Sequence, residues 1–131
     1  MPAYMVEEAC WLKERSPLPI IADESVINNL DIPNLKDAFD GINIKLMKAG
    51  GISEALEMII TARSLGMKIM LGCMIESSVA ISAAAHIAPL VDYIDLDGSL
   101  LLANDPYDSV KIKNGKIVLS DLPGLGIIQD R

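Results

Sequence analysis

Two aspartates in the last third of the sequence, Asp95 and Asp97, stand one residue apart at the end of the largely apolar stretch VDYIDLD. On a β-strand, residues i and i+2 point to the same face, so the two carboxylates can converge on one spot. Two negative charges that share a face favour a bound cation. A turn also accepts Asp and Gly for local reasons, so a structural role is the alternative for this pair.

Other ionisable side chains close or follow apolar runs of the kind that form buried strands. Asp23 and Glu24 come directly after PLPIIA, and Lys45 closes INIK. We favour a functional role for Lys45, because an unpaired buried lysine is costly. Asp23 and Glu24 could instead cap a turn after a strand. Glu76 comes just beyond a third apolar run. It could line the site itself or only support the residues that do.

Three further residues are interpreted as structural. Lys48 is expected either on the loop or as a solvated residue at the rim of the strand ends. Cys73 is expected to be a packing residue, because no base stands near it in sequence. His86 lies among alanines in a predicted helix, which favours a structural or surface histidine over a metal ligand.

The elements that must position these side chains alternate along the chain. Apolar spacing predicts helices over 3–15, 33–39, 51–65 and 77–88, and strands over 19–23, 42–46, 67–71 and 91–96. Alternating strands and helices with short connections imply parallel pairing through right-handed crossovers. Both a doubly wound sheet and a β/α barrel have this order.

The position of the polar residues decides between these two α/β folds. No G-x-G-x-x-G turn follows any predicted strand, so the dinucleotide-binding signature is absent from the sequence. Instead, each predicted strand has a polar residue at its C-terminal end, where β/α barrels build their active sites. The sequence therefore predicts four parallel strands with helices, half of a TIM-like β/α barrel.

The end of the chain does not follow this alternation. Two short alternating runs at 110–119 flank Asn114-Gly115, a strong β-hairpin signal. The segment 121–128, with two glycines and a proline, is predicted as an irregular closing segment. We therefore divide the chain into a partial barrel, 1–109, and a hairpin with a C-terminal tail, 110–131, that packs outside the barrel.

Composition limits the possible partners and the compartment. The 131 residues suit a single domain, and a formal net charge of −7 disfavours nucleic acid as a ligand. No apolar run approaches the roughly 18 residues of a membrane-spanning helix. Two cysteines without metal-binding spacing suggest reduced thiols and a cytoplasmic protein. Hydrophobic residues make up 51% of the chain, an excess that suggests either strands buried on both faces or an apolar surface that a partner covers.

Four motifs in register carry a family resemblance. ADES (22–25), NIKLMKAGGISEAL (43–56), LGCMIESSV (71–79) and DLDGSLLL (95–102) resemble the C-terminal half of an enolase-superfamily enzyme of the muconate-lactonizing subgroup. Within the subgroup, the DLDG element most resembles the dipeptide epimerases, which act on L-Ala-D/L-Glu-like substrates. The resemblance runs from about residue 4 to the closing PGLG.

The resemblance implies a role for each matching residue. Asp23 matches the third of three carboxylates that hold magnesium, and Lys45 matches one of two lysines that remove and return the proton next to a substrate carboxylate. A lysine base must itself lose a proton near neutral pH, which burial and a nearby metal ion would favour. Asp95 and Asp97 match the pair that binds the dipeptide's α-ammonium group. Glu24 and Glu76 would contact these site residues without contacting the substrate.

The resemblance also shows what the chain lacks. Complete members carry a capping domain and eight barrel positions, of which the first four would precede residue 1. Two metal carboxylates and the partner K-x-K lysines belong to that part, and the KIK at 111–113 is an accidental match in the predicted hairpin. We therefore expect weak or absent magnesium binding and no epimerase activity from the chain alone.

Other functions remain open from sequence. The chain could derive from a muconate cycloisomerase, an o-succinylbenzoate synthase or an N-acylamino acid racemase, or it could be a non-catalytic assembly module. A half-barrel would also expose two sheet edges, so we expect self-association or a partner that supplies the missing half.

Overall fold

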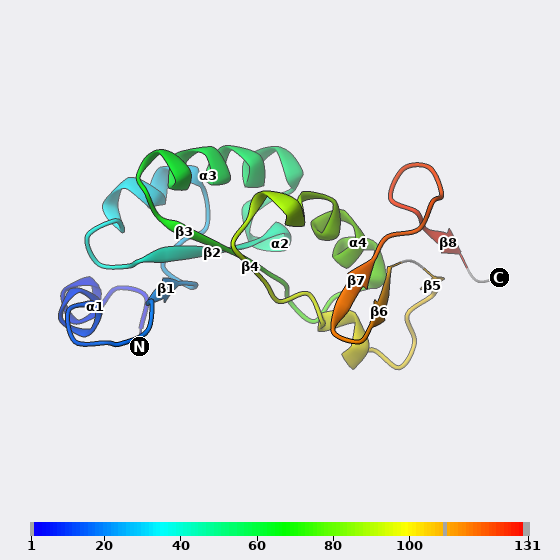
Figure 1. The fold of residues 1–131 in the computed structure, drawn as a ribbon, viewed down its shortest axis with the longest axis horizontal. Coiled ribbons are helices and arrows are strands. Elements are labelled where there is room, and N and C mark those ends of the chain that lie inside the picture. The colour runs from blue at the N-terminus through cyan, green and yellow to red at the C-terminus, as the bar shows by residue number, and fades with distance from the viewer. Residues whose placement is uncertain (1, 109, 130–131) are drawn as a thin grey trace.

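The computed structural model, which describes residues 2–108 and 110–129, is built around one four-stranded parallel sheet (Figure 1). Its strands are β1 (Ile21–Ala22), β2 (Gly41–Lys45), β3 (Lys68–Gly72) and β4 (Tyr93–Ile94), and each pairs with the next in chain order. A doubly wound sheet reverses its strand order part-way, whereas a β/α barrel keeps it. The predicted half of a β/α barrel is therefore confirmed.

Helices cover one face of this sheet. The α-helices are α1 (Val6–Lys13), α2 (Leu46–Ala49), α3 (Ile52–Ser64) and α4 (Ser78–Ile87). In Figure 1, α3 and α4 lie along the same side of the sheet, while α1 lies near β1, away from the C-terminal elements. The helices predicted over 3–15, 51–65 and 77–88 are confirmed with shorter ends, and α2 is an addition.

The two central strands have faces of different character. Ile42 and Ile44 of β2, with Ile69 and Leu71 of β3, have no exposed surface and form part of the hydrophobic core. The alternate residues of the same strands point to the opposite face, which carries polar groups such as Lys45. The sheet thus anchors its apolar residues on one face and offers functional side chains on the other.

The helix predicted over 33–39 is wrong. The chain instead forms a 3₁₀-helix, η1 (Asn29–Asn34), which begins earlier because Asn28 and Asp31 make a reciprocal capping box. Pro33 lies inside this helix and has no N–H to donate, so a regular α-helix cannot continue through it. Short 3₁₀ turns also follow α4 and β4, as η2 (Ala88–Leu90) and η3 (Gly98–Leu101).

The predicted hairpin is confirmed as β6 (Lys111–Lys113) and β7 (Lys116–Val118). Its turn places Asn114 and Gly115 at φ 52° and 71°, the two positive values that a type I′ turn requires. The KIK motif lies in β6, as expected. The irregular segment predicted over 121–128 is confirmed up to Ile128, where β8 (Ile128–Gln129) begins and pairs with β5 (Tyr107–Asp108). Neither short strand was predicted, because two-residue strands carry no alternation to detect.

The division at 109 and 110 remains a prediction, and residues 1, 109, 130 and 131 lie outside the described part of the chain. Within that part, Val110 and Ile117 pack against the main hydrophobic core. The hairpin is therefore attached to the partial barrel by apolar contacts.

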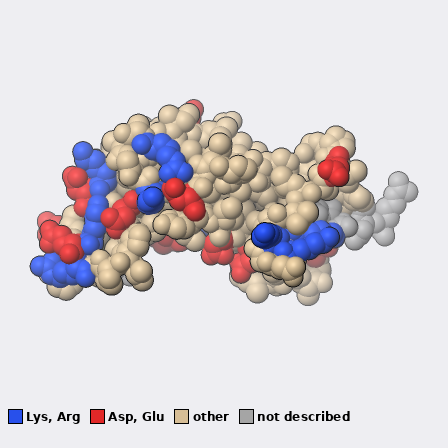
Figure 2. Space-filling view, viewed as in Figure 1, with Lys and Arg blue, Asp and Glu red and all other residues tan. Residues whose placement is uncertain are grey.

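The four-stranded sheet does not close on itself, so it has two edge strands. β1 and β4 are its two edges, and Tyr93 and Ile94 of β4 are 44% and 51% exposed. Figure 2 shows charged side chains of both signs near α1 and a basic cluster over the hairpin, with a largely uncharged surface between them. Within the described part of the chain, no helix combines the length and hydropathy needed to cross a bilayer.

Candidate functional site

A cavity of about 250 Å³ lies at the C-terminal ends of β1, β2 and β3. Lys45 and Gly72, the last residues of β2 and β3, face each other in the strand register. Asp23, directly after β1, and Asp95, directly after β4, also line the cavity. Because parallel strands end at the same edge, the sheet brings together charged residues that are up to 72 positions apart in sequence, the separation between Asp23 and Asp95. The remaining lining residues are Ile21, Asn43, Met70 and Cys73.

Two lysines share the carboxylate of Asp23. Lys45 Nζ lies 2.9 Å from Asp23 Oδ2, and Lys48 Nζ lies 2.7 Å from Asp23 Oδ1. Lys48 also donates to the main-chain carbonyl of Asp23 at 2.7 Å. The expectation of a solvated Lys48 on a loop is therefore wrong. Lys48 belongs to α2, which starts immediately after Lys45 and turns its ammonium back towards Asp23.

These contacts shift the ionisation of both partners. Partial burial of Asp23 acts to raise the pKa of its carboxyl, but the hydrogen bonds and charges of Lys48 and Lys45 outweigh it and hold this pKa below its ordinary value. The hydrogen bond to Asp23 holds the pKa of Lys45 above its ordinary value, against the effect of burial. Burial acts to lower the pKa of Lys45, as expected, but the ion pair with Asp23 outweighs it.

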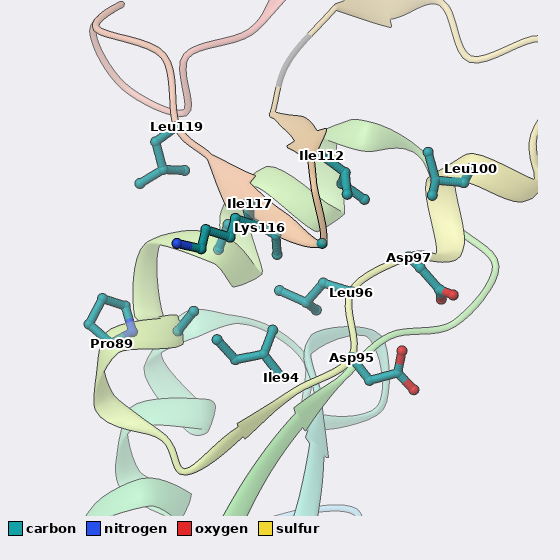
Figure 3. Close-up of a pocket in the computed structure, with 13 residues that line it drawn as sticks. Pro89, Ile94, Asp95, Leu96, Asp97, Leu100, Ile112, Lys116, Ile117 and Leu119 are labelled. Carbon is teal, nitrogen blue, oxygen red and sulfur yellow. The ribbon is translucent and has the colours of Figure 1, made fainter.

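Asp95 and Asp97 point to the same side of their segment (Figure 3). They do so although β4 ends at Ile94, so strand alternation is not the whole reason. The intervening Leu96 is buried and points to the opposite side, towards the hairpin, which fixes the direction of its two neighbours. Both aspartates are exposed, and neither makes an ion pair with any residue the structure describes.

Gly98 holds the aspartate segment against the loop that follows β3. Its N–H donates to Cys73 Sγ at 3.3 Å. A Cβ atom at this position would lie 2.1 Å from the Met74 carbonyl oxygen, closer than any real contact. The glycine of the DLDG motif is thus needed for a close approach of two segments, and Cys73 takes a packing role. Burial raises the pKa of the Cys73 thiol, which disfavours its use as a nucleophile.

Glu24 and Glu76, the two carboxylates expected to support the site, lie in different environments. Glu24 lies 3.8 Å from Lys45 and is 70% exposed, so its contribution to this ion pair is small. Glu76 lies in the loop between β3 and α4, and its Oε2 atom is buried without a hydrogen-bond partner among the described residues. Burial raises the pKa of Glu76. His86 Nδ1 donates to the Ser82 carbonyl oxygen one turn away in α4, as a structural histidine does.

The donor set for a metal ion is incomplete in this chain. Across residues 2–108 and 110–129, no three His, Cys, Asp or Glu side chains gather in a group that could hold a metal ion. Asp23 is a suitable hard oxygen ligand at the cavity, but both of its oxygens contact lysine ammonium groups. A magnesium site here needs further carboxylates from outside the described residues.

Sequence reasoning missed the role of Asn43. This residue of β2 is 6% exposed and lines the cavity two positions before Lys45. Its Oδ1 atom is buried without a hydrogen-bond partner among the described residues, next to the space left by Gly72. A polar residue at i−2 from Lys45 within an apolar strand was the available signal.

A larger cavity of about 670 Å³ lies on the other side of the aspartate segment (Figure 3). Ile94 of β4 and Leu96, just after that strand, face it from one side, and Ile112 and Ile117 face it from the hairpin. Its lining is mainly apolar, so the described residues offer no reacting groups there apart from the flanking aspartates and Lys116.

Comparison with known proteins agrees with this geometry. The L-Ala-D/L-Glu epimerase of Bacteroides thetaiotaomicron is 50% identical over 98% of this chain and 34% of its own length. A substrate-liganded complex of the L-Ala-D/L-Glu epimerase from Bacillus subtilis superposes with a TM-score of 0.92 at 34% identity, over 100% of this chain and 38% of that one.

A dipeptide epimerase from Cytophaga hutchinsonii, complexed with Mg and D-Ala-L-Val, superposes with a TM-score of 0.90 at 30% identity, over 98% and 37% of the two chains. The chain thus spans between 34% and 38% of the length of these relatives. The model of the enolase C-terminal domain-like family matches residues 1–131. The strand order, the charged cavity at the strand ends and these similarities place the chain in the enolase C-terminal domain-like family.

Proposed function

We propose that this chain supplies the C-terminal half-barrel of a dipeptide epimerase. The observation that carries the proposal is one cavity that holds both Lys45 and Asp95, a base candidate and an acidic group without an ion-pair partner among the described residues. The similarity to epimerases of L-Ala-D/L-Glu and of other dipeptides supports the same reaction.

Lys45 is the acid/base residue in this proposal. Its neutral amine takes the α-proton of the residue that bears the free carboxylate, and its ammonium form can give a proton back on the same face. Positioned proton transfer of this kind contributes roughly 10²–10⁴-fold to a rate. Inversion of the α-carbon also requires a second group on the opposite face, which must come from outside the described residues.

Asp95 and Asp97 bind the α-ammonium group of the dipeptide. Both side chains point to one side, and a cation placed between them receives charge-assisted hydrogen bonds, which are stronger than neutral ones. A ligand without an amine leaves two carboxylates unpaired. This feature favours a dipeptide over a muconate or an N-acylated amino acid.

Asp23 is proposed as one ligand of a magnesium ion in the completed barrel. Magnesium supplies positive charge that stabilises the enediolate formed when the α-proton leaves. The chain's own contribution is to hold the Asp23 carboxylate at the cavity mouth, beside Lys45.

The proposal is tested in a joined protein, in which this chain replaces the matching C-terminal third of the B. thetaiotaomicron epimerase. Exchange of the α-proton of L-Ala-L-Glu in D₂O with magnesium is followed by NMR. We expect exchange in the joined protein and a loss of at least 10²-fold in Lys45→Ala. Lys36→Ala, an exposed lysine outside the cavity, is the matched control and should exchange normally. Equal exchange in the Lys45→Ala protein would contradict the assigned role.

The amine-binding role has its own test in the same joined protein. Asp95→Asn and Asp97→Asn should raise KM for L-Ala-L-Glu by about tenfold or more each, since each removes a charge-assisted contact. They should change KM for the N-acetylated dipeptide much less. A similar rise in KM for both substrates would show that the pair does not bind the amine.

A further inference from the structure

The segment that carries the aspartate pair is attached to the end of β3 at two points. The Asp95 N–H donates to the Leu71 carbonyl oxygen at 2.9 Å, a main-chain bond at the end of the β3–β4 pairing. Three residues later, the Gly98 N–H donates to Cys73 Sγ at 3.3 Å. Asp97 lies between these two attachments, so the attachments together set the position of both carboxylates.

The second attachment is made by a side chain. Gly98 opens η3 and is buried, so its N–H needs an acceptor within the protein. A Cβ atom at Gly98 would overlap the Met74 carbonyl oxygen and lie 3.0 Å from Cys73 Sγ, so the two segments are in direct contact. The Cys73 thiol lies at this contact and supplies the acceptor, a role that sulfur can take although it is a weak acceptor.

Cys73 is close to the proposed amine site. It follows β3 directly and lines the same cavity as Asp95. Burial is the main cause of the raised pKa of its thiol, and the charges of Asp95 and Asp97 raise this pKa further. The thiol is therefore neutral near neutral pH, and it binds the Gly98 N–H without adding negative charge beside the two carboxylates.

We propose that Cys73 is a positioning residue, whose thiol anchors Gly98 and thereby holds the aspartate pair where it receives the α-ammonium group of a dipeptide. This inference rests on the proposed amine-binding role of Asp95 and Asp97. Without the thiol, the buried Gly98 N–H loses its acceptor, and the aspartate segment keeps one of its two attachments. The carboxylates then move apart more easily, and affinity for the amine falls while Lys45 keeps its place at the end of β2.

The test in the joined protein compares Cys73→Ala with Cys73→Ser. Cys73→Ala removes the acceptor, so we expect KM for L-Ala-L-Glu to rise by about threefold to tenfold. The value of kcat should change by less than about twofold, because Lys45 contributes from another strand. Cys73→Ser keeps an acceptor at this position and should recover most of the loss. Cys10→Ala, in α1, changes the other cysteine of the chain and is the matched control.

A second substrate separates this role from a general effect on structure. KM for the N-acetylated dipeptide should change by less than about twofold in Cys73→Ala, because this ligand has no ammonium group for the aspartate pair to bind. An equal rise in KM for both substrates overturns the proposal, as does an unchanged KM for L-Ala-L-Glu.

Amide hydrogen exchange of the 131-residue chain, followed by NMR, gives a readout that needs no activity. In Cys73→Ala the Gly98 N–H should exchange about tenfold faster, whereas the Asp95 N–H keeps its main-chain acceptor and should exchange as before. Unchanged exchange at Gly98, or equal acceleration at both amides, would overturn the anchoring contact. If the unaltered joined protein does not prefer L-Ala-L-Glu to its N-acetylated form, the proposed amine-binding role fails. If it does, and the preference survives in Cys73→Ala, only the present inference fails.

Discussion

Asp92 attaches β4, the strand that precedes the aspartate pair, to the rest of the sheet, and its substitution should lower stability by an amount that the contacts allow us to predict. Asp92 precedes β4, and its Oδ2 accepts from the Ile69 N–H at 2.8 Å and from Arg63 Nη1 at 2.6 Å. Its own N–H donates to the Ile69 carbonyl oxygen at 2.9 Å. β4 itself has only two residues and pairs with β3 alone. The side chain of Asp92 therefore makes an important contribution to the attachment of β4 to β3.

The expected loss follows from these contacts. A hydrogen bond from an N–H to a charged acceptor contributes about 1.5–3 kcal/mol. The pair with Arg63, whose side chain is 42% exposed, adds about 0–1 kcal/mol. We expect Asp92→Ala to lower the free energy of unfolding by about 2–3 kcal/mol, measured by urea denaturation of the chain. Asp37→Ala, on the exposed surface, is the control and should change it by less than about 0.5 kcal/mol.

The pH dependence of this difference provides a second arm. The Ile69 N–H, and then Arg63, hold the pKa of Asp92 below its ordinary value, although burial opposes them. A lowered pKa in the folded state stabilises the protein fully above the unfolded pKa of about 3.9, and this stabilisation is lost as the pH falls through the folded pKa. The gap between the unaltered chain and Asp92→Ala should therefore be constant near pH 6–7 and shrink below about pH 4. A gap under about 0.5 kcal/mol at pH 7, or one that persists undiminished at low pH, would refute this account.

Three other changes test the site and the open sheet. Gly98→Ala would place its Cβ 2.1 Å from the Met74 carbonyl oxygen, so we expect it to displace the aspartate segment. KM for L-Ala-L-Glu in the joined protein should then rise by about tenfold or more. Gly124→Ala, near the C-terminus, should leave this KM unchanged. Calorimetric titration of the 131-residue chain with magnesium should show no binding tighter than about 1 mM, because no three potential ligand side chains gather among the described residues, and a micromolar Kd would contradict this. Sedimentation should show association that increases with chain concentration, driven by the edges β1 and β4, and a strictly monomeric chain would show that these edges are tolerated in water.

The central part of the fold was predictable because its signals are long and local. The strand predicted over 42–46 and the helix over 51–65 are found at Gly41–Lys45 and Ile52–Ser64, since a continuous apolar run and a 3.6-residue repeat each specify one answer. The hairpin was predictable for a different reason, as Asn-Gly suits a turn with two positive φ values.

The errors arise where a single side chain overrides a pattern. The helix predicted over 33–39 is replaced by a 3₁₀-helix that starts earlier, because the capping box between Asn28 and Asp31 fixes its beginning. The role of Lys48 was missed because it depends on Asp23, which is 25 positions away and comes close only when β1 and β2 pair. Sequence spacing places residues on an element, whereas contacts between elements need the sheet register.

Charge is distributed unevenly across the proposed site, and this asymmetry bears on which ligands it accepts. On one side, Asp23 is matched by two ammonium groups, so that side carries no excess negative charge. On the other side, Asp95 and Asp97 have no ion-pair partner among the residues described, although Asp95 shares the cavity with Lys45. A ligand that is cationic at one end and carries its acidic C–H bond further along therefore matches the arrangement in one orientation only. In a dipeptide the ammonium belongs to the first residue and the carboxylate to the second. With the ammonium at the aspartates, the α-carbon presented to Lys45 is that of the second residue, so we expect deuterium to enter L-Ala-L-Glu at the Glu α-carbon and not at the Ala α-carbon.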